Sequence, residues 1–314
     1  MLSDLLKLLY FRFGYVERII FTIVKCFTFF LISGTTYAEE QIDSSSIAVR
    51  DVLSAQGEWQ FDIDYLYSNN QSTTVHSGGG IGVIQSSSTT TENSSLTKSS
   101  SDILIISPAL RYGLTSDTEI APSISWQAYQ TRTQERNAVT TESGDKLTSL
   151  NLAVNHRFTN NGARSAVIGS FNLNLAENVG KDNEEIVYGR AWSASVTGFR
   201  VYDPVVMSVA VGYQEFLQRN VDGDIVNPGE IVFVNGGINF AANSDLSLKM
   251  GFTWTYTSRN EINGQKQGIA VTTTSLGFGF GYEWSVNTLV FFAVNTVVSG
   301  GEGATISLNT SYYL

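Results

Sequence analysis

The sequence has almost no cysteine, little charge and no long apolar run outside its N-terminus. Its single cysteine, Cys26, lies in the N-terminal segment, so the rest of the chain has neither disulfides nor thiol chemistry. The absence of a later apolar run of about 18 residues argues against a helical membrane protein. Charged residues make up 15% of the 314 residues, against about 25% in soluble domains.

The residues that usually carry catalysis are also scarce. The two histidines, His76 and His156, have no nucleophile or carboxylate context, which argues against a barrel phospholipase. No His or Cys spacing is typical of a metal site. The stretch 220–224 with Glu230 offers oxygen ligands for calcium, but it lacks the full EF-hand pattern, and we favour a plain acidic loop. We therefore expect no enzyme activity, no cofactor and no metal.

Residues 1–38 have the features of a cleavable signal peptide. Arg12 and Arg18 supply positive charge, 19–32 is mostly apolar, and 36–38 reads Thr-Tyr-Ala, a small-x-small cleavage site. A transmembrane anchor is the alternative, which the shortness of the apolar run disfavours.

The remaining chain is acidic. Of the 19 basic and 29 acidic residues, four and two lie in residues 1–38, which leaves 15 against 27 and a net charge of −12. Nucleic acid is therefore not an expected partner, because its phosphates would be repelled.

The stretch 104–130 shows the strongest structural pattern. Apolar residues alternate with small or polar ones over 104–114, a short turn follows at 115–117, and the alternation resumes over 119–130. Alternation over about 10 residues on both sides of a short turn is typical of a membrane-spanning β-hairpin. Soluble strands usually run for only about 5–6 residues.

The same alternation recurs and predicts twelve strands. They lie at 57–68, 104–114, 119–130, 147–158, 167–175, 188–201, 205–213, 231–241, 246–256, 276–284, 289–298 and 305–314. Bacterial single-chain barrels require an even number. We therefore predict an all-β fold, a transmembrane antiparallel up-and-down β-barrel over residues 57–314, set in the lipid bilayer of the bacterial outer membrane.

The connections alternate between short turns and longer polar segments. Short turns lie at 115–117, 159–164, 202–204, 243–245 and 285–288, and polar segments that we interpret as loops lie at 69–101, 133–146, 177–187, 220–230 and 259–268. Outer-membrane barrels have short periplasmic turns, so both ends of the barrel are expected in the periplasm. The apolar phase changes near Gly198, for which a β-bulge is the simplest account.

Both ends of the barrel carry further signals. Residues 39–56 do not alternate, and we expect either a periplasmic leader or a short plug helix docked in the lumen. Residues 305–314 resemble the C-terminal signal that the barrel-assembly machinery reads, which makes that machinery an expected partner.

In such a barrel the outward face meets lipid and the inward face determines function. Seven charged residues have the inward phase and are our candidates for lining or gating the lumen: Asp62, Asp64, Arg111, Glu119, Arg157, Lys249 and Glu283. Strand direction places Asp62 and Asp64 nearer the middle of the bilayer and the other five in the periplasmic half. The charges either neutralise one another as packing or line a polar path, and both interpretations stay open.

Six glycines also have the inward phase: Gly212, Gly237, Gly251, Gly277, Gly279 and Gly281. Glycine allows another backbone or a ligand to approach closely, so this wall is a candidate surface for residues 39–56. The alternative, which we favour, is that the glycines ease curvature of the sheet.

A family resemblance adds to this interpretation. Its residues are Val52-Leu53 and Gly57, then Leu-Arg-Tyr-Gly-Leu-Thr at 110–115, Asp117 and Glu119-Ile120. This pattern resembles the outer-membrane family named for the meta-pathway of phenol degradation, and the resemblance implies a transporter-like barrel. The exporter of functional amyloid subunits is a related twelve-stranded type with a plug helix, but this chain lacks the coiled-coil leader expected of it.

The leading functional hypothesis is a channel or transporter for small solutes, with apolar or aromatic molecules among the candidates, gated by residues 39–56. The alternative is a structural or surface-interaction barrel with a filled lumen, whose outer loops, especially 69–101, bind partners as an adhesin does. Export of an amyloid-type subunit is a further alternative.

Overall fold

The computed structural model describes residues 53–77, 80–82, 95–135, 138–160, 165–178, 186–221 and 223–314. These residues form seventeen strands, and they contain no helix long and apolar enough to cross a membrane. The strands are β1 (Trp59–Ser77), β2 (Gly80–Gly82), β3 (Ser95–Thr115), β4 (Thr118–Glu135), β5 (Ala138–Asn160), β6 (Ser165–Asn178), β7 (Ile186–Tyr202), β8 (Val205–Phe216), β9 (Arg219–Val221), β10 (Asp224–Asn227), β11 (Glu230–Ala241), β12 (Leu246–Thr257), β13 (Asn260–Ile262), β14 (Gln265–Gln267), β15 (Val271–Ser285), β16 (Thr288–Ser299) and β17 (Gly303–Tyr313). The expected signal peptide and most of the leader lie outside the described residues.

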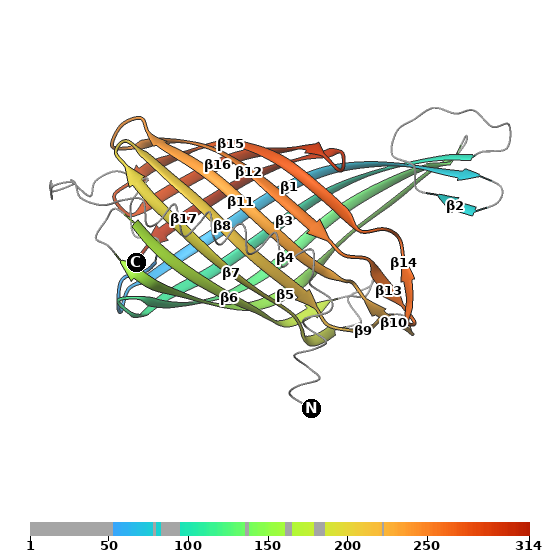
Figure 1. The fold of residues 1–314 in the computed structure, drawn as a ribbon, viewed down its shortest axis with the longest axis horizontal. Coiled ribbons are helices and arrows are strands. Elements are labelled where there is room, and N and C mark those ends of the chain that lie inside the picture. The colour runs from blue at the N-terminus through green and yellow to red at the C-terminus, as the bar shows by residue number, and fades with distance from the viewer. Residues whose placement is uncertain are drawn as a thin grey trace, which may run out of the picture. The chain divides into compact units, whose positions relative to one another are not determined.

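Twelve long strands form one closed antiparallel barrel (Figure 1). Neighbours follow the order β17-β16-β15-β12-β11-β8-β7-β6-β5-β4-β3-β1, and β17 pairs with β1 from Tyr313↔Gln60 to Gly303↔Asn70. Closure removes the sheet edges, whose unpaired backbone groups could not be tolerated in a bilayer. The predicted twelve-stranded up-and-down barrel is confirmed.

The strands present an apolar face outward. On β15, the side chains of Leu276, Phe278, Phe280 and Tyr282 are exposed on the outer surface, while the residues between them face the interior. Large exposed apolar side chains recur in the same phase on the other barrel strands, and a soluble monomer rarely exposes so large an apolar surface. The outer face is therefore of the kind that contacts lipid.

One end of the barrel carries the short turns, and we call it the short-turn end. Residues 116–117 join β3 to β4, 203–204 join β7 to β8, and 286–287 join β15 to β16. The C-terminal Leu314 also lies at this end (Figure 1), where its N–H donates to the carbonyl oxygen of Trp59 at 3.0 Å.

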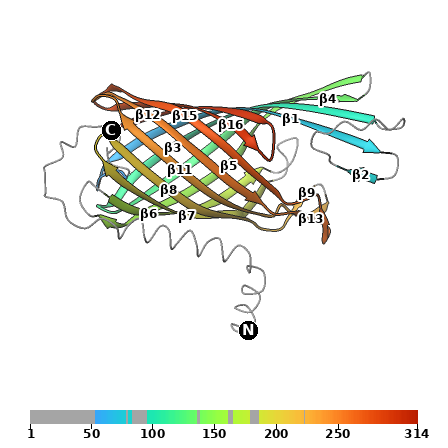
Figure 2. The same ribbon diagram turned by 45° about the horizontal axis from the view of Figure 1, so that its top comes forward.

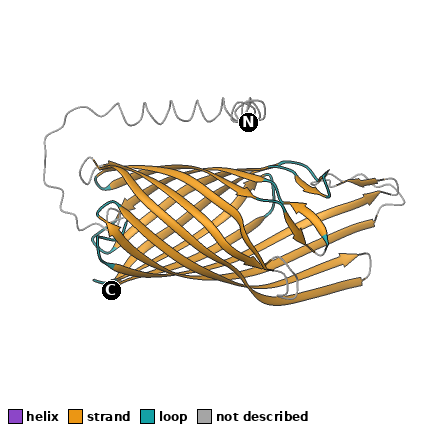
Figure 3. Ribbon diagram, turned by 90° about the horizontal axis from the view of Figure 1, so that it is seen from below, coloured by secondary structure: helices purple, strands orange, loops and turns teal. Residues whose placement is uncertain are grey.

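At the opposite end, which we call the long-hairpin end, several strands continue past the barrel. β1, β3, β4 and β5 contain 19, 21, 18 and 23 residues, and they project from this end as a ribbon (Figure 2). The short strands β9, β10, β13 and β14 form a separate four-stranded sheet, and Figure 3 shows strand as the dominant element throughout the described residues.

The segments predicted as loops are therefore largely strands. Residues 69–76 pair with 95–102, and 127–135 pair with 138–146. The prediction was wrong because alternation reports a difference between two faces of a strand. At 138–143 the side chains on both faces are exposed, so the alternation disappears there while the backbone pairing continues.

The predicted bulge at Gly198 is also absent. β7 pairs with β8 in unbroken register from Ala191 to Tyr202, and the shift in its pairing with β6 lies at Asn174/Ala176 instead. The apolar phase changes near Gly198 because the inward-facing residues of β7 and its neighbours become apolar towards the short-turn end. The buried apolar residues at this end are Ala166, Ile168, Val201, Val206 and Leu289.

Candidate functional site

The barrel interior holds solvent-accessible space. Inward-facing positions are mostly Ser, Thr, Asn and Gly, and cross-strand polar contacts such as Ser107 to Ser125, 2.8 Å between the hydroxyl oxygens, line the wall. Asp64 on β1 and Lys249 on β12 point inward by register, and both side chains are nevertheless exposed. A packed core would have buried them, because charged side chains are almost never buried without partners.

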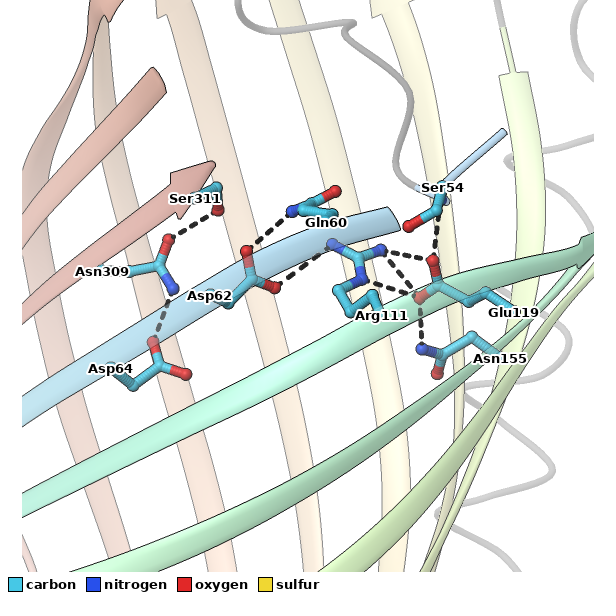
Figure 4. A network of polar contacts seen from close by, with 9 residues as sticks. All are labelled: Ser54, Gln60, Asp62, Asp64, Arg111, Glu119, Asn155, Asn309 and Ser311. Atoms are coloured by element: carbon cyan, nitrogen blue, oxygen red, sulfur yellow. Dashed lines mark hydrogen bonds and ion pairs between the residues drawn. The ribbon is translucent and has the colours of Figure 1, made fainter. Parts of the chain in front are cut away.

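A buried ion pair lies on the inner surface at the short-turn end (Figure 4). Arg111 on β3 donates from Nε and Nη2 to Glu119 Oε1 on β4, at 3.0 and 2.7 Å, and from Nη2 to Oε2 at 2.8 Å. Asn155 on β5 donates to Oε1 at 2.7 Å. Glu119 is 0% exposed, so its charge depends on these partners.

Two residues of β1 extend this network. Arg111 Nη1 lies 3.7 Å from Asp62 Oδ2, and Gln60 Nε2 donates to Asp62 Oδ1 at 2.7 Å. Arg111 thus lies between two carboxylates. Asp62 is one inward position further from the short-turn end than Gln60, which pairs with Arg111. Asp64, one inward position further along, accepts a hydrogen bond from Asn309 Nδ2 on β17 at 2.7 Å.

Residues 53–57, which we call the docking segment, lie over this ion pair. The backbone N–H of Ser54 donates to Glu119 Oε2 at 2.7 Å, and the N–H of Gly57 donates to the carbonyl oxygen of Gly113 at 2.8 Å. Leu53 and Ser54 are buried. The segment therefore covers part of the inner wall at the short-turn end.

Gly113 makes room for this contact. A Cβ at Gly113 would lie 2.0 Å from the carbonyl oxygen of Ala55 and 2.7 Å from that of Ser54, so only glycine allows the segment to approach β3 this closely. The predicted plug helix lies outside the described residues except for 53–56, which are not helical. This described part docks on β3 and not on the predicted glycine wall.

The glycine wall accommodates atoms of the wall itself. At Gly251 and Gly279 an added Cβ would meet a backbone oxygen of the neighbouring strand at 2.8 and 2.3 Å. At Gly212 and Gly281 it would meet an inward-facing phenylalanine ring at 2.1 and 2.6 Å. At these four positions a Cβ would therefore overlap atoms of the barrel wall itself. The role in sheet curvature that we favoured stays a prediction.

The other three predicted residues lie apart from the ion pair. Arg157 on β5 holds the β3–β4 turn, donating from Nε to Asp117 Oδ1 at 3.0 Å and from Nη2 to the carbonyl oxygen of Ser116 at 2.5 Å. Counted from β3 through β1 and its pairing with β17, Glu283 on β15 lies four strands away and Lys249 on β12 lies five strands away. The seven residues therefore do not form one cluster.

The contact between Arg157 and the turn perturbs an acid group outside the membrane-spanning strands. Hydrogen bonds from Ser116 and from Arg157 hold the pKa of Asp117 below its usual value. The Asp117 side chain is about half exposed, so the contact fastens the turn without contributing much to overall stability.

A second ion pair, which the sequence pattern did not predict, lies at the long-hairpin end. Arg219 on β9 is 6% exposed, and its Nη1 lies 2.5 Å from Glu177 Oε2 on β6. Both residues fall at the edges of segments that we had predicted as loops, where no alternation assigns a face. The one available signal was the position of an arginine directly before the acidic stretch 220–224.

Comparisons with known proteins bear on the fold. No protein-family model matches the sequence, and no curated protein matches it. The crystal structure of the COG4313 outer membrane channel from Pseudomonas putida F1 is similar, with a TM-score of 0.61 and 13% identity over 84% of this chain and 98% of that one. The fold is that of an outer-membrane β-barrel.

Two further solved barrels share parts of this architecture. The translocator domain of the autotransporter NalP from Neisseria meningitidis has a TM-score of 0.48 and 13% identity over 84% of this chain and 92% of that one. The CymD monoaromatic hydrocarbon channel has a TM-score of 0.44 and 10% identity over 82% and 88%.

Proposed function

We propose that this protein is an outer-membrane channel that passes small solutes, including apolar or aromatic ones, through the barrel interior. The observation that carries the proposal is the solvent exposure of the inward-facing Asp64 and Lys249 inside a closed wall. A filled barrel would bury such groups, and charged side chains are almost never fully buried.

In this proposal the short-turn end faces the periplasm, because bacterial barrels have short periplasmic turns. The barrel-assembly machinery would recognise residues 305–314 at the same end. Residues 39–56 gate the channel, and Asp62, Arg111 and Glu119 anchor the described end of that segment. Asp64, Lys249 and Glu283 line the path, whereas Arg157 fastens a turn.

Single-channel conductance in a planar bilayer tests both parts of this proposal. We would compare the protein lacking residues 1–38 with one lacking residues 1–56, each refolded and checked by its heat-dependent migration in gels. We expect current from both and a larger current from the shorter one. Equal currents contradict gating by residues 39–56, and silence from two folded proteins contradicts the channel.

The projecting ribbon of β1, β3, β4 and β5 favours a second candidate function, binding of a partner at the cell surface. Ribbon strands of 18 to 23 residues exceed the roughly 9–11 residues that cross a bilayer. Removal of 72–99 shortens the first hairpin. If the ribbon is the functional part, this deletion abolishes attachment of expressing cells to surfaces and leaves conductance unchanged.

A further inference from the structure

Two neighbouring barrel strands part at the long-hairpin end. β7 and β8 pair as far as Ala191↔Phe216, and the N–H of Leu217 still donates to the carbonyl oxygen of Arg190 at 2.7 Å. Beyond this point β7 stays with β6, through Tyr188↔Ala176, while the chain after β8 turns into β9 and pairs with β10. A fork therefore opens between β7 and β9.

The fork contains a cavity of about 600 Å³, a size within the range of roughly 300–1,000 Å³ found for small-molecule sites. Apolar lining comes from Ile186, Val187 and Tyr188 on β7 and from Ile225 on β10. Two cations, Arg190 and Arg219, line the same cavity. Apolar walls with a few convergent polar groups are typical of a ligand site.

Arg219 lies at the base of the fork and links its two sides. Besides its ion pair with Glu177, its Nη2 donates to the carbonyl oxygen of Arg190 at 3.3 Å, and its guanidinium carbon lies 5.5 Å from the centre of the Phe216 ring. The Nε–H of Arg219 is buried and has no acceptor among the residues that the structure describes. Such a buried donor is unfavourable unless an acceptor reaches it.

The charges in the fork favour an anion. Glu177 compensates the charge of Arg219. Arg190 is exposed, and it is the other charged residue among the described residues that line the cavity. An ionised carboxylate forms a strong charge-assisted hydrogen bond with a guanidinium, and the apolar walls favour a ligand whose remainder is apolar.

We infer that this fork binds a small amphipathic anion, such as an aromatic carboxylate, with its ring against Ile186, Val187 and Ile225 and its carboxylate at Arg219 Nε and Arg190. The inference rests on the proposed channel function, because the site would collect solute at the outer mouth. It adds a substrate class to that function.

Equilibrium dialysis of benzoate against the folded protein in detergent tests the site without requiring a pore. We expect saturable binding that Arg219→Gln weakens by at least about tenfold, the size of effect expected from losing a charge-assisted hydrogen bond. Arg200→Gln, on the same strand as Arg190 but at the short-turn end, is the matched control and should bind as the unaltered protein does. Acetate, which lacks the ring, and benzyl alcohol, which lacks the charge, should both bind more weakly than benzoate.

A second pair of variants covers the risk that Arg219→Gln does not fold because Glu177 loses its partner. Arg219→Gln/Glu177→Gln removes both charges, and Ile225→Asp adds a negative charge to the cavity wall, so both should lose benzoate. Undiminished binding in these folded variants, or equal binding of benzyl alcohol, overturns the inference. Benzoate binding by a protein without conductance supports the site and contradicts the channel, whereas conductance without binding supports the channel and contradicts the site.

Discussion

Replacement of Gly113 with alanine tests directly whether the docking segment restricts the lumen. The added Cβ would lie 2.0 Å from the carbonyl oxygen of Ala55 and 2.6 Å from its carbonyl carbon. Both atoms belong to the backbone, so no side-chain rotation relieves the overlap. To reach ordinary contact at 3.4 Å the segment must retreat by roughly 1.4 Å.

A retreat of this size breaks the hydrogen bonds that hold the segment. The bond from Ser54 to the Glu119 carboxylate is worth about 1.5–3 kcal/mol, and the bonds between Gly113 and residues 57 and 58 about 0.5–1.5 kcal/mol each. Their loss amounts to roughly 2.5–6 kcal/mol, which lowers the population of the docked segment by about 70-fold or more. The barrel strands keep their own pairing, so the fold should survive.

The assay combines conductance with limited proteolysis from the short-turn end. We expect Gly113→Ala to show a larger current and faster cleavage within residues 39–57 than the unaltered protein. Gly237→Ala is the control, because the nearest atom to its new Cβ is the Ser208 hydroxyl oxygen at 3.0 Å, which can rotate away. A folded Gly113→Ala protein with the original current and the original protection refutes the idea that docking restricts the lumen.

Three other changes test separate parts of the structure. Arg111→Gln leaves the buried Glu119 carboxylate without its guanidinium, so we expect unfolding in urea to show a loss of about 3–5 kcal/mol; the double variant with Glu119→Gln should recover most of it, and a fully stable single variant contradicts the importance of the pair. Lys249→Glu places a negative charge in the solvent-accessible interior and should shift the reversal potential in a salt gradient towards cation selectivity; an unchanged potential excludes Lys249 from the path. The lowered pKa of Asp117 means that its contact with Arg157 stabilises the turn fully above the usual Asp pKa of about 3.9 and is lost as the pH falls through the lowered value. In the Arg157→Gln variant, the backbone amides of the β3–β4 turn should therefore exchange hydrogen faster than in the unaltered protein at neutral pH, and this difference in rate should shrink in acid. A difference that does not depend on pH contradicts the role of the Asp117 carboxylate.

The barrel itself was predictable from the sequence because a bilayer imposes one rule on every strand. Lipid on one side and water on the other force alternation over the spanning length. This rule identified all twelve strands and those short turns that the structure describes. It failed where the rule ceases to apply. Residues 138–143 are exposed on both faces of their strand, so this part of the strand leaves no periodic trace.

The site was only half predictable, because alternation assigns a face but not a depth or a partner. It placed Asp62, Arg111 and Glu119 on the inner surface, yet their contacts depend on the registers of β1, β3 and β4, which hydrogen bonding sets across strands. It also placed Arg157 inward, although its long side chain reaches the turn instead. The pair of Arg219 and Glu177 depends on where β7 and β8 part, and no local pattern encodes a fork between strands.

The stretch 110–120, on which the family resemblance rests, has a structural explanation at each of its distinctive positions. Arg111 and Glu119 form the buried ion pair, Gly113 admits the docking segment, and Asp117 accepts the hydrogen bond that fastens the turn. All of these contacts lie at the short-turn end and hold one hairpin and one segment together. Residues engaged in this way have few free donors or charges to offer a passing solute. In the proposed channel, discrimination among solutes should therefore depend on groups that remain accessible, namely Asp64 and Lys249 in the interior and Arg190 in the fork. Barrels that share the 110–120 pattern can then differ in the solutes that they pass.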